Sequence, residues 1–67
     1  MKKWSNDLIK LSRKYLKISG TMVKSMQGEF GILDIENNIY YILILNSDKT
    51  LTFNSVEDIL LAGWVVD

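Results

Sequence analysis

The sequence predicts one small α+β domain over residues 1–67, with an N-terminal amphipathic helix packed on a three-stranded antiparallel meander. A short C-terminal helix and a terminal extended segment follow. Residues 39–45 predict a central strand, because they are apolar on both alternating faces and rich in β-branched and aromatic side chains. Turn-forming residues flank this run on both sides. Residues 4–18 instead repeat their apolar positions at helical spacing.

The composition limits what the chain can do. A chain of 67 residues lies near the lower size limit for a self-sufficient core, and it contains neither cysteine nor histidine. Disulfides are therefore excluded, and the commonest zinc ligand and general base are missing. We expect no cofactor, no metal and no enzymatic activity, and we expect oligomerisation to supply part of the stability.

Nothing in the sequence directs the chain to export or to a membrane. It lacks the apolar core of a signal peptide, and it has no apolar run near 20 residues. We therefore expect a soluble protein in the cytoplasm of its host cell, with no membrane partner.

Charge is separated along the chain although the net charge is zero. Residues 1–27 carry seven of the eight basic side chains and one acidic one, and residues 28–67 carry the reverse. This asymmetry indicates either a basic face for an acidic or phosphate-bearing partner, or complementarity within the fold or between subunits.

An amphipathic helix is predicted over residues 6–18, with Ser5 as its N-cap. Its apolar stripe consists of Trp4, Leu8, Leu11, Tyr15 and Ile18, widened by Ile9 and Leu16. We interpret the stripe as core rather than as a membrane anchor. The basic patch outside it consists of Lys10, Arg13, Lys14 and Lys17. This patch is either a solvated surface or a site for phosphate or nucleic acid.

Residues 19–28 have no clear period. Gly20 suits the end of the helix, residues 21–23 fit either a short strand or a loop, and residues 24–28 read as a loop.

Three antiparallel strands are predicted over residues 29–35, 39–46 and 50–53, joined by two-residue turns at Asn37-Asn38 and Ser47-Asp48. The first turn pairs Ile35 with Tyr40, Leu33 with Ile42 and Gly31 with Ile44, and the second pairs Ile44 with Leu51 and Ile42 with Phe53. These pairings place one apolar face against the N-terminal helix: Leu33, Ile35, Tyr40, Ile42, Ile44, Leu51 and Phe53. Gly31 is expected to leave a gap that a helix backbone can approach.

The opposite face of the meander is the predicted ligand or partner surface. It consists of Phe30, Ile32, Tyr41, Leu43, Leu45 and Asn54, beside Asp34, Thr50 and Thr52. An apolar cluster of this size on a small domain indicates a covered surface. The cover is either the C-terminal segment or another subunit. We favour a homodimer or higher homo-oligomer, in which a ligand can also be held between subunits.

The last element is a helix over residues 56–62 that Ser55 caps and Gly63 ends. Glu57 and Asp58 lie in its first turn, where the helix dipole favours acidic groups. Residues 64–66 form a short strand or an extended tail.

Residues 55–66, Ser-Val-Glu-Asp-Ile-Leu-Leu-Ala-Gly-Trp-Val-Val, resemble the C-terminal signature of small phage proteins in the Thoeris anti-defence sponge family. Asp58, Ala62 and Trp64 match the structural part of that signature. Gly63 stands where the family has an acidic residue, and the family's arginine-containing strand is not found. The resemblance implies a non-enzymatic oligomer that sequesters a cyclic-nucleotide-like immune signal.

Three functional hypotheses follow. The first is a phage or mobile-element protein that acts as a stoichiometric inhibitor or adaptor of a host protein. The second is an oligomeric sponge for an anionic, nucleotide-like ligand. The third is a nucleic-acid binder that uses the basic patch.

Overall fold

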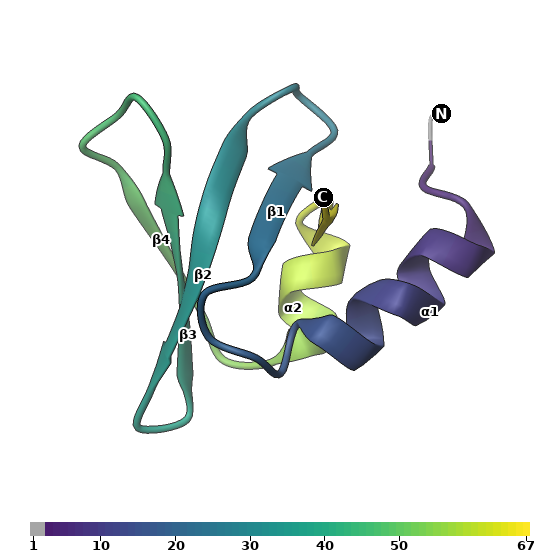
Figure 1. The fold of residues 1–67 in the computed structure, drawn as a ribbon, viewed down its shortest axis with the longest axis horizontal. Coiled ribbons are helices and arrows are strands. Elements are labelled where there is room, and N and C mark those ends of the chain that lie inside the picture. The colour runs from purple at the N-terminus through teal and green to yellow at the C-terminus, as the bar shows by residue number, and fades with distance from the viewer. Residues whose placement is uncertain (1–2) are drawn as a thin grey trace.

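The computed structural model describes residues 3–67, which form two helices and five strands (Figure 1). In chain order the elements are α1 (Asn6–Tyr15), β1 (Met22–Ser25), β2 (Phe30–Glu36), β3 (Ile39–Ile44), β4 (Thr50–Phe53), α2 (Val56–Leu61) and β5 (Trp64–Val66). The α+β class and the order of helix, sheet and short helix are confirmed.

The sheet has five strands rather than the three that the sequence predicts. The strands lie in the order β4-β3-β2-β1-β5, and every neighbouring pair is antiparallel. Part of the segment expected to be a loop, residues 24–25, belongs to β1, and the C-terminal tail is β5. Both additions arise because β1 pairs with β2 on one side and with β5 on the other, so the tail is held by backbone hydrogen bonds as well as by apolar burial.

The first predicted hairpin register is confirmed. Ile35 pairs with Tyr40 and Gly31 with Ile44. The turn residues Asn37 and Asn38 have φ angles of 52° and 65°. Asparagine tolerates this left-handed conformation, which the tightest hairpin turn requires at both central positions.

The second predicted register is wrong by two residues. Ile42 pairs with Leu51, and Tyr40 pairs with Phe53. The Ile44 N–H donates to the Lys49 carbonyl over 3.2 Å, so four residues, 45–48, form the loop instead of two. A shift of two residues leaves every side chain on its predicted face, because the side-chain period of a strand is two.

The core lies on the face of the sheet that carries Leu33 and Ile42, here called the inner face, and both side chains are fully buried there. The other inner-face residues predicted from the sequence also belong to the core or pack against it: Ile35, Tyr40, Ile44, Leu51 and Phe53. α2 contributes the fully buried Ile59, and it contacts both outermost strands, β4 and β5. The sheet therefore curves around α2, which is drawn between the sheet and α1 in Figure 1.

The N-terminal helix was predicted to lie across the inner face, and this prediction is wrong. The helix packs along β5 at one edge of the sheet (Figure 1). α1 starts as expected, because the Ser5 hydroxyl accepts a hydrogen bond from the Leu8 N–H, but it ends at Tyr15 instead of residue 18. Its buried side is centred on Ser12 and Leu16, which are both fully buried.

The predicted apolar stripe of this helix is therefore only partly buried. Leu11, Tyr15 and Ile18 remain 46%, 38% and 53% exposed. A polar contact of the helix explains this orientation. The Ser12 hydroxyl accepts a hydrogen bond of 3.0 Å from the Val66 N–H, so the serine side of the helix faces the sheet edge.

The gap predicted at Gly31 does not face a helix. A Cβ atom added to Gly31 would lie 2.7 Å from Ile42 Cγ2 and 3.0 Å from the Leu43 carbonyl oxygen, which both belong to β3. The space that a side chain at position 31 would need is thus occupied by atoms of β3.

The second helix ends at Leu61, one residue before the predicted limit. Its N-terminus is capped as expected, because the Ser55 hydroxyl accepts a hydrogen bond of 3.1 Å from the Asp58 N–H. Gly63 has a φ angle of 92°, as a left-handed helix end requires. Within residues 3–67, neither helix has the length and apolar character needed to cross a membrane.

Candidate interaction surface

The outer face of the sheet, opposite α2, carries a row of apolar side chains across three strands. Ile32 of β2 lies between Met22 of β1 and Leu43 of β3 in the strand pairing. Phe30 lies two residues before Ile32 on the same face of β2, beside Leu45, whose N–H donates to the Phe30 carbonyl. The strand pairing therefore brings together five apolar residues that are far apart in sequence.

Most of these side chains are in contact with solvent. Phe30 is 48% exposed, Leu43 45%, Met22 41% and Leu45 40%, while Ile32 is half-buried. A contiguous exposed cluster of large apolar groups is typical of an interaction surface.

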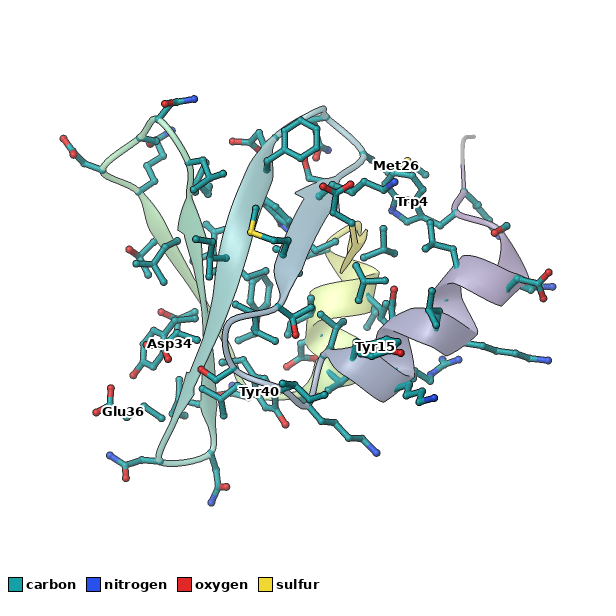
Figure 2. All side chains as sticks on the ribbon, in the orientation of Figure 1. Trp4, Tyr15, Met26, Asp34, Glu36 and Tyr40 are labelled. Atoms are coloured by element: carbon teal, nitrogen blue, oxygen red, sulfur yellow. The ribbon has the colours of Figure 1, made fainter. Side chains whose placement is uncertain are left out.

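Tyr41, Asp34 and Thr52 form the next row of the same face, because Tyr41 pairs with both of the others. The Asp34 carboxylate accepts a hydrogen bond of 2.8 Å from the Ser19 hydroxyl. Among residues 3–67, the Tyr41 hydroxyl makes no hydrogen bond to another group. Asp34 and Glu36 are labelled in Figure 2, near the end of the sheet that carries the first hairpin turn.

The predicted surface is therefore assembled with one exception and one addition. Asn54 follows the end of β4 and lies outside the paired register, at the margin of the face. Met22 belongs to the face but was missed, because the assignment of residues 21–28 stayed open. In the structure Met22 is exposed and Val23 is buried, which is the alternation typical of a strand with one covered face.

The C-terminal segment does not fold over this face. It pairs instead with β1, with Val23 opposite Val66 and Lys24 opposite Val65. Of the two covers that the sequence left open, the C-terminal segment is thus excluded. Within residues 3–67, nothing covers Phe30, Leu43 and Leu45.

A hollow of about 410 Å³ opens at the end of the outer face, between the second hairpin loop and the β1–β2 turn. Its walls are Met22, Gly28, Glu29, Phe30, Ile44, Leu45, Asn46 and Ser47. The walls combine apolar groups with a carboxylate, an amide and a hydroxyl. Such a lining suits one anchoring side chain of a polypeptide better than a phosphate, which the carboxylate would repel.

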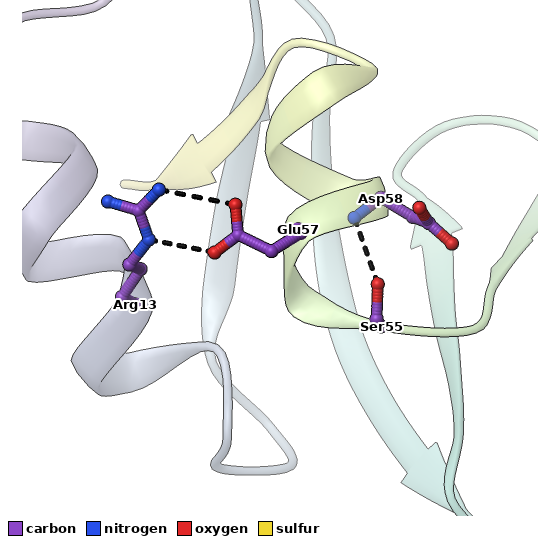
Figure 3. A network of polar contacts seen from close by, with 4 residues as sticks. All are labelled: Arg13, Ser55, Glu57 and Asp58. Carbon is purple, nitrogen blue, oxygen red and sulfur yellow. Dashed lines mark hydrogen bonds and ion pairs between the residues drawn. The ribbon is translucent and has the colours of Figure 1, made fainter.

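Figure 3 shows that Arg13 of the predicted basic patch is engaged by α2. Its Nε and Nη2 atoms lie 2.8 and 3.2 Å from the two carboxylate oxygens of Glu57. The hydrogen bond from Arg13, with its positive charge, lowers the pKa of the Glu57 carboxyl, and the same contact raises the pKa of Arg13. Part of the charge asymmetry of the sequence is thus neutralised inside the fold.

The other three members of the patch, Lys10, Lys14 and Lys17, are exposed. In the described part of the chain the ion pairs are those of Arg13 with Glu57 and of Lys24 with Asp67. The Lys14 ammonium lies 5.5 Å from the centre of the Tyr15 ring. The patch therefore offers three lysines to solvent.

A second hollow, of about 600 Å³, lies between the start of α1 and the end of α2. Trp4, Met26 and Leu61 are among its walls, and the Trp4 Nε1–H donates to the Gly63 carbonyl over 2.9 Å. The indole is therefore fixed in place and joins the two ends of the chain. For residues 3–67, no cluster of three carboxylates is arranged to hold a metal ion.

Comparison of the chain with protein families, with curated proteins and with solved structures found no match. The function has to be argued from the surface itself.

Proposed function

We propose that this chain is a small non-enzymatic binding protein whose outer sheet face binds another protein. It acts by stoichiometric occlusion, as an inhibitor or adaptor of the kind that phages and other mobile elements direct at host proteins. The observation that supports the proposal is the uncovered apolar cluster of Phe30, Leu43 and Leu45, together with Met22.

The chemistry of the face favours a polypeptide partner over a nucleotide-like ligand. The charged groups beside the apolar cluster are Asp34, the hollow's Glu29 and Lys24, and the Lys24 ammonium is already paired with the Asp67 carboxylate at 3.8 Å. A phosphate-bearing ligand would be repelled there, whereas an interface between proteins typically combines an apolar centre with a polar rim. The hollow beside Phe30 and Leu45 would receive an anchoring side chain of the partner.

The test is a quantitative capture experiment in host-cell lysate with the tagged protein and two lysine variants. Leu43→Lys places a charge in the centre of the face. Leu61→Lys makes the same change at a leucine of α2 that is 85% exposed, and it is the matched control. We expect one stoichiometric partner with the wild-type chain and with Leu61→Lys, and loss of that partner with Leu43→Lys.

Circular dichroism must show that both variants are folded, which the exposure of both leucines favours. Equal recovery of the partner by Leu43→Lys and Leu61→Lys would assign binding to another surface. The absence of any stoichiometric partner would remove the proposal.

A second candidate function is the capture of an anionic ligand by α1, and the three exposed lysines of the basic patch support it. This includes the nucleotide sponge that the resemblance of residues 55–66 implies, and binding of nucleic acid. The Arg13–Glu57 pair removes one of the four cations from the patch.

A labelled single-stranded oligonucleotide tests this candidate. We expect binding to weaken steeply as salt is raised, and to be lost when Lys10, Lys14 and Lys17 are all changed to glutamate. For an equal change in net charge, the single variant Lys14→Glu is compared with Lys49→Glu, at an exposed lysine of the second hairpin. Affinity that is insensitive to the triple change would exclude the patch as the site.

A further inference from the structure

The outer face is self-complementary about one particular twofold axis. Phe30, Ile32 and Asp34 alternate along one face of β2. Ile32 and Asp34 pair with Leu43 and Tyr41 of β3, and Phe30 lies beside Leu45, which directly follows β3. A twofold axis that runs along the strands, midway between β2 and β3, places β3 of one copy over β2 of the other.

With that axis each side chain meets a chemically suitable one. Leu45 lies over Phe30 of the second copy, and Leu43 lies over its Ile32. Apolar groups are therefore matched with apolar groups, as the centre of a twofold interface requires. Each contact occurs twice.

The same axis brings the Tyr41 hydroxyl to Asp34 of the second copy. In the single chain this hydroxyl makes no hydrogen bond among residues 3–67, while the Asp34 carboxylate accepts one, from Ser19. A carboxylate can accept several hydrogen bonds, so the tyrosine adds a donor without displacing the serine. The acidic group on the face thus gains a partner when the face is covered.

The curvature of the sheet limits contact to these strands. Because α2 contacts both outermost strands on the inner face, the outer face is convex, and β2 and β3, near the middle of the sheet order, form its crest. Two convex faces touch along parallel crests. The zero net charge of the chain means that two copies have no long-range repulsion between net charges.

From this layout we propose that a second copy of the chain covers the outer face in a face-to-face homodimer with its twofold axis along β2 and β3. The inference rests on the proposed function in taking the outer face as the protein-binding surface. It adds that the occupant, in the absence of another protein, is the chain itself. A partner protein then competes with the second copy for the same residues.

Sedimentation equilibrium of the purified chain, from about 1 to about 100 µM, is the test, because this range covers micromolar dissociation constants. We expect a dimer for the wild-type chain and for Leu61→Lys. Leu43→Lys and Phe30→Lys are expected to be folded monomers, since both side chains are half-exposed in the single chain.

Tyr41→Phe tests the axis itself. It removes two symmetry-related hydrogen bonds to carboxylates, so the dissociation constant of the dimer is expected to rise about tenfold or more. Thr52→Val, on the same row of the outer face but on β4, is the control and leaves dimerisation unchanged.

Each other outcome overturns a stated part of the inference. A wild-type chain that is monomeric over the whole range removes the dimer, although a partner captured from lysate would still support the proposed function. A dimer that survives Leu43→Lys assigns self-association to another surface. A dimer with no partner in lysate removes the proposed function and leaves the dimer. Unchanged affinity of Tyr41→Phe excludes this axis.

Discussion

At the scale of single residues, Ser12 shows how one polar group sets the orientation of a helix. Its side chain is fully buried, and its hydroxyl accepts the hydrogen bond of the Val66 N–H over 3.0 Å. Ser12→Ala leaves that N–H buried without a partner, so we expect a loss of about 1–3 kcal/mol in the free energy of unfolding. Urea denaturation measures it, with Ser47→Ala as the exposed control. Equal losses in the two variants would contradict a special role for Ser12.

The Arg13–Glu57 pair makes a prediction about pH. The hydrogen bond and the charge of Arg13 lower the pKa of Glu57 in the folded state. A lowered folded-state pKa gives stability that is present above the carboxyl's unfolded pKa and is lost as the pH falls through the folded one. We expect a small coupling between Arg13→Gln and Glu57→Gln at neutral pH in a double-mutant cycle, because both side chains are exposed. The coupling should disappear in acid, and a coupling that persists there would contradict the ion pair.

At the scale of elements, the strand pattern was readable where turn chemistry was local. Two asparagines with left-handed backbone angles define the first hairpin, and its register is as predicted. The second loop is longer, and its left-handed residue is Asn46, with a φ angle of 61°, which lies outside the predicted Ser47-Asp48 turn. The side chains still lie on their predicted faces because the register is shifted by two residues. The local pattern left residues 21–23 open between strand and loop, and residues 64–66 open between strand and tail. The strand alternative is correct for both, because β1 pairs with β2 and with β5, which lies some forty residues later in the sequence. The outer face of β2 and β3 was predictable because these strands form a local hairpin. Met22 was missed because residues 21–23 could not be assigned to a strand.

Gly31 carries the prediction at this scale. It lies in β2 opposite Ile44, and a Cβ atom there would lie 2.7 Å from Ile42 Cγ2 and 3.0 Å from a backbone oxygen of β3. Because a strand backbone cannot yield as a side chain can, we expect Gly31→Ala to lower the free energy of unfolding by about 1–3 kcal/mol. Thr52→Ala, on an exposed strand position, is the control in chemical denaturation. A neutral or stabilising Gly31→Ala would show that β2 and β3 separate easily.

At the scale of the whole molecule, the two ends of the chain close the fold on each other. Trp4 binds the carbonyl of Gly63 through its indole N–H, and Ser12 binds the backbone of Val66. α1 thereby covers the outer edge of β5, one of the two edge strands, and an uncovered edge is prone to pair with other chains. The opposite charges of the two halves also meet here, at Arg13 and Glu57. The sequence showed the charge separation, but not that α1 and α2 would use it.

Removal of the last strand tests this closure. Truncation after Gly63 deletes Trp64, Val65 and Val66, which are 3%, 0% and 6% exposed, and it leaves the edge of β1 and the hydroxyl of Ser12 without partners. Burial of three such side chains contributes about 1.5–3 kcal/mol each, which equals or exceeds the roughly 3–5 kcal/mol that a core of this size supplies. We expect the truncated chain to be unfolded by circular dichroism, whereas deletion of Asp67 alone removes one hydrogen bond to Met22 and the ion pair with Lys24 and leaves the fold intact. A cooperative thermal transition in the truncated chain would show that β1 to β4 and α2 are stable without the closure of the two ends.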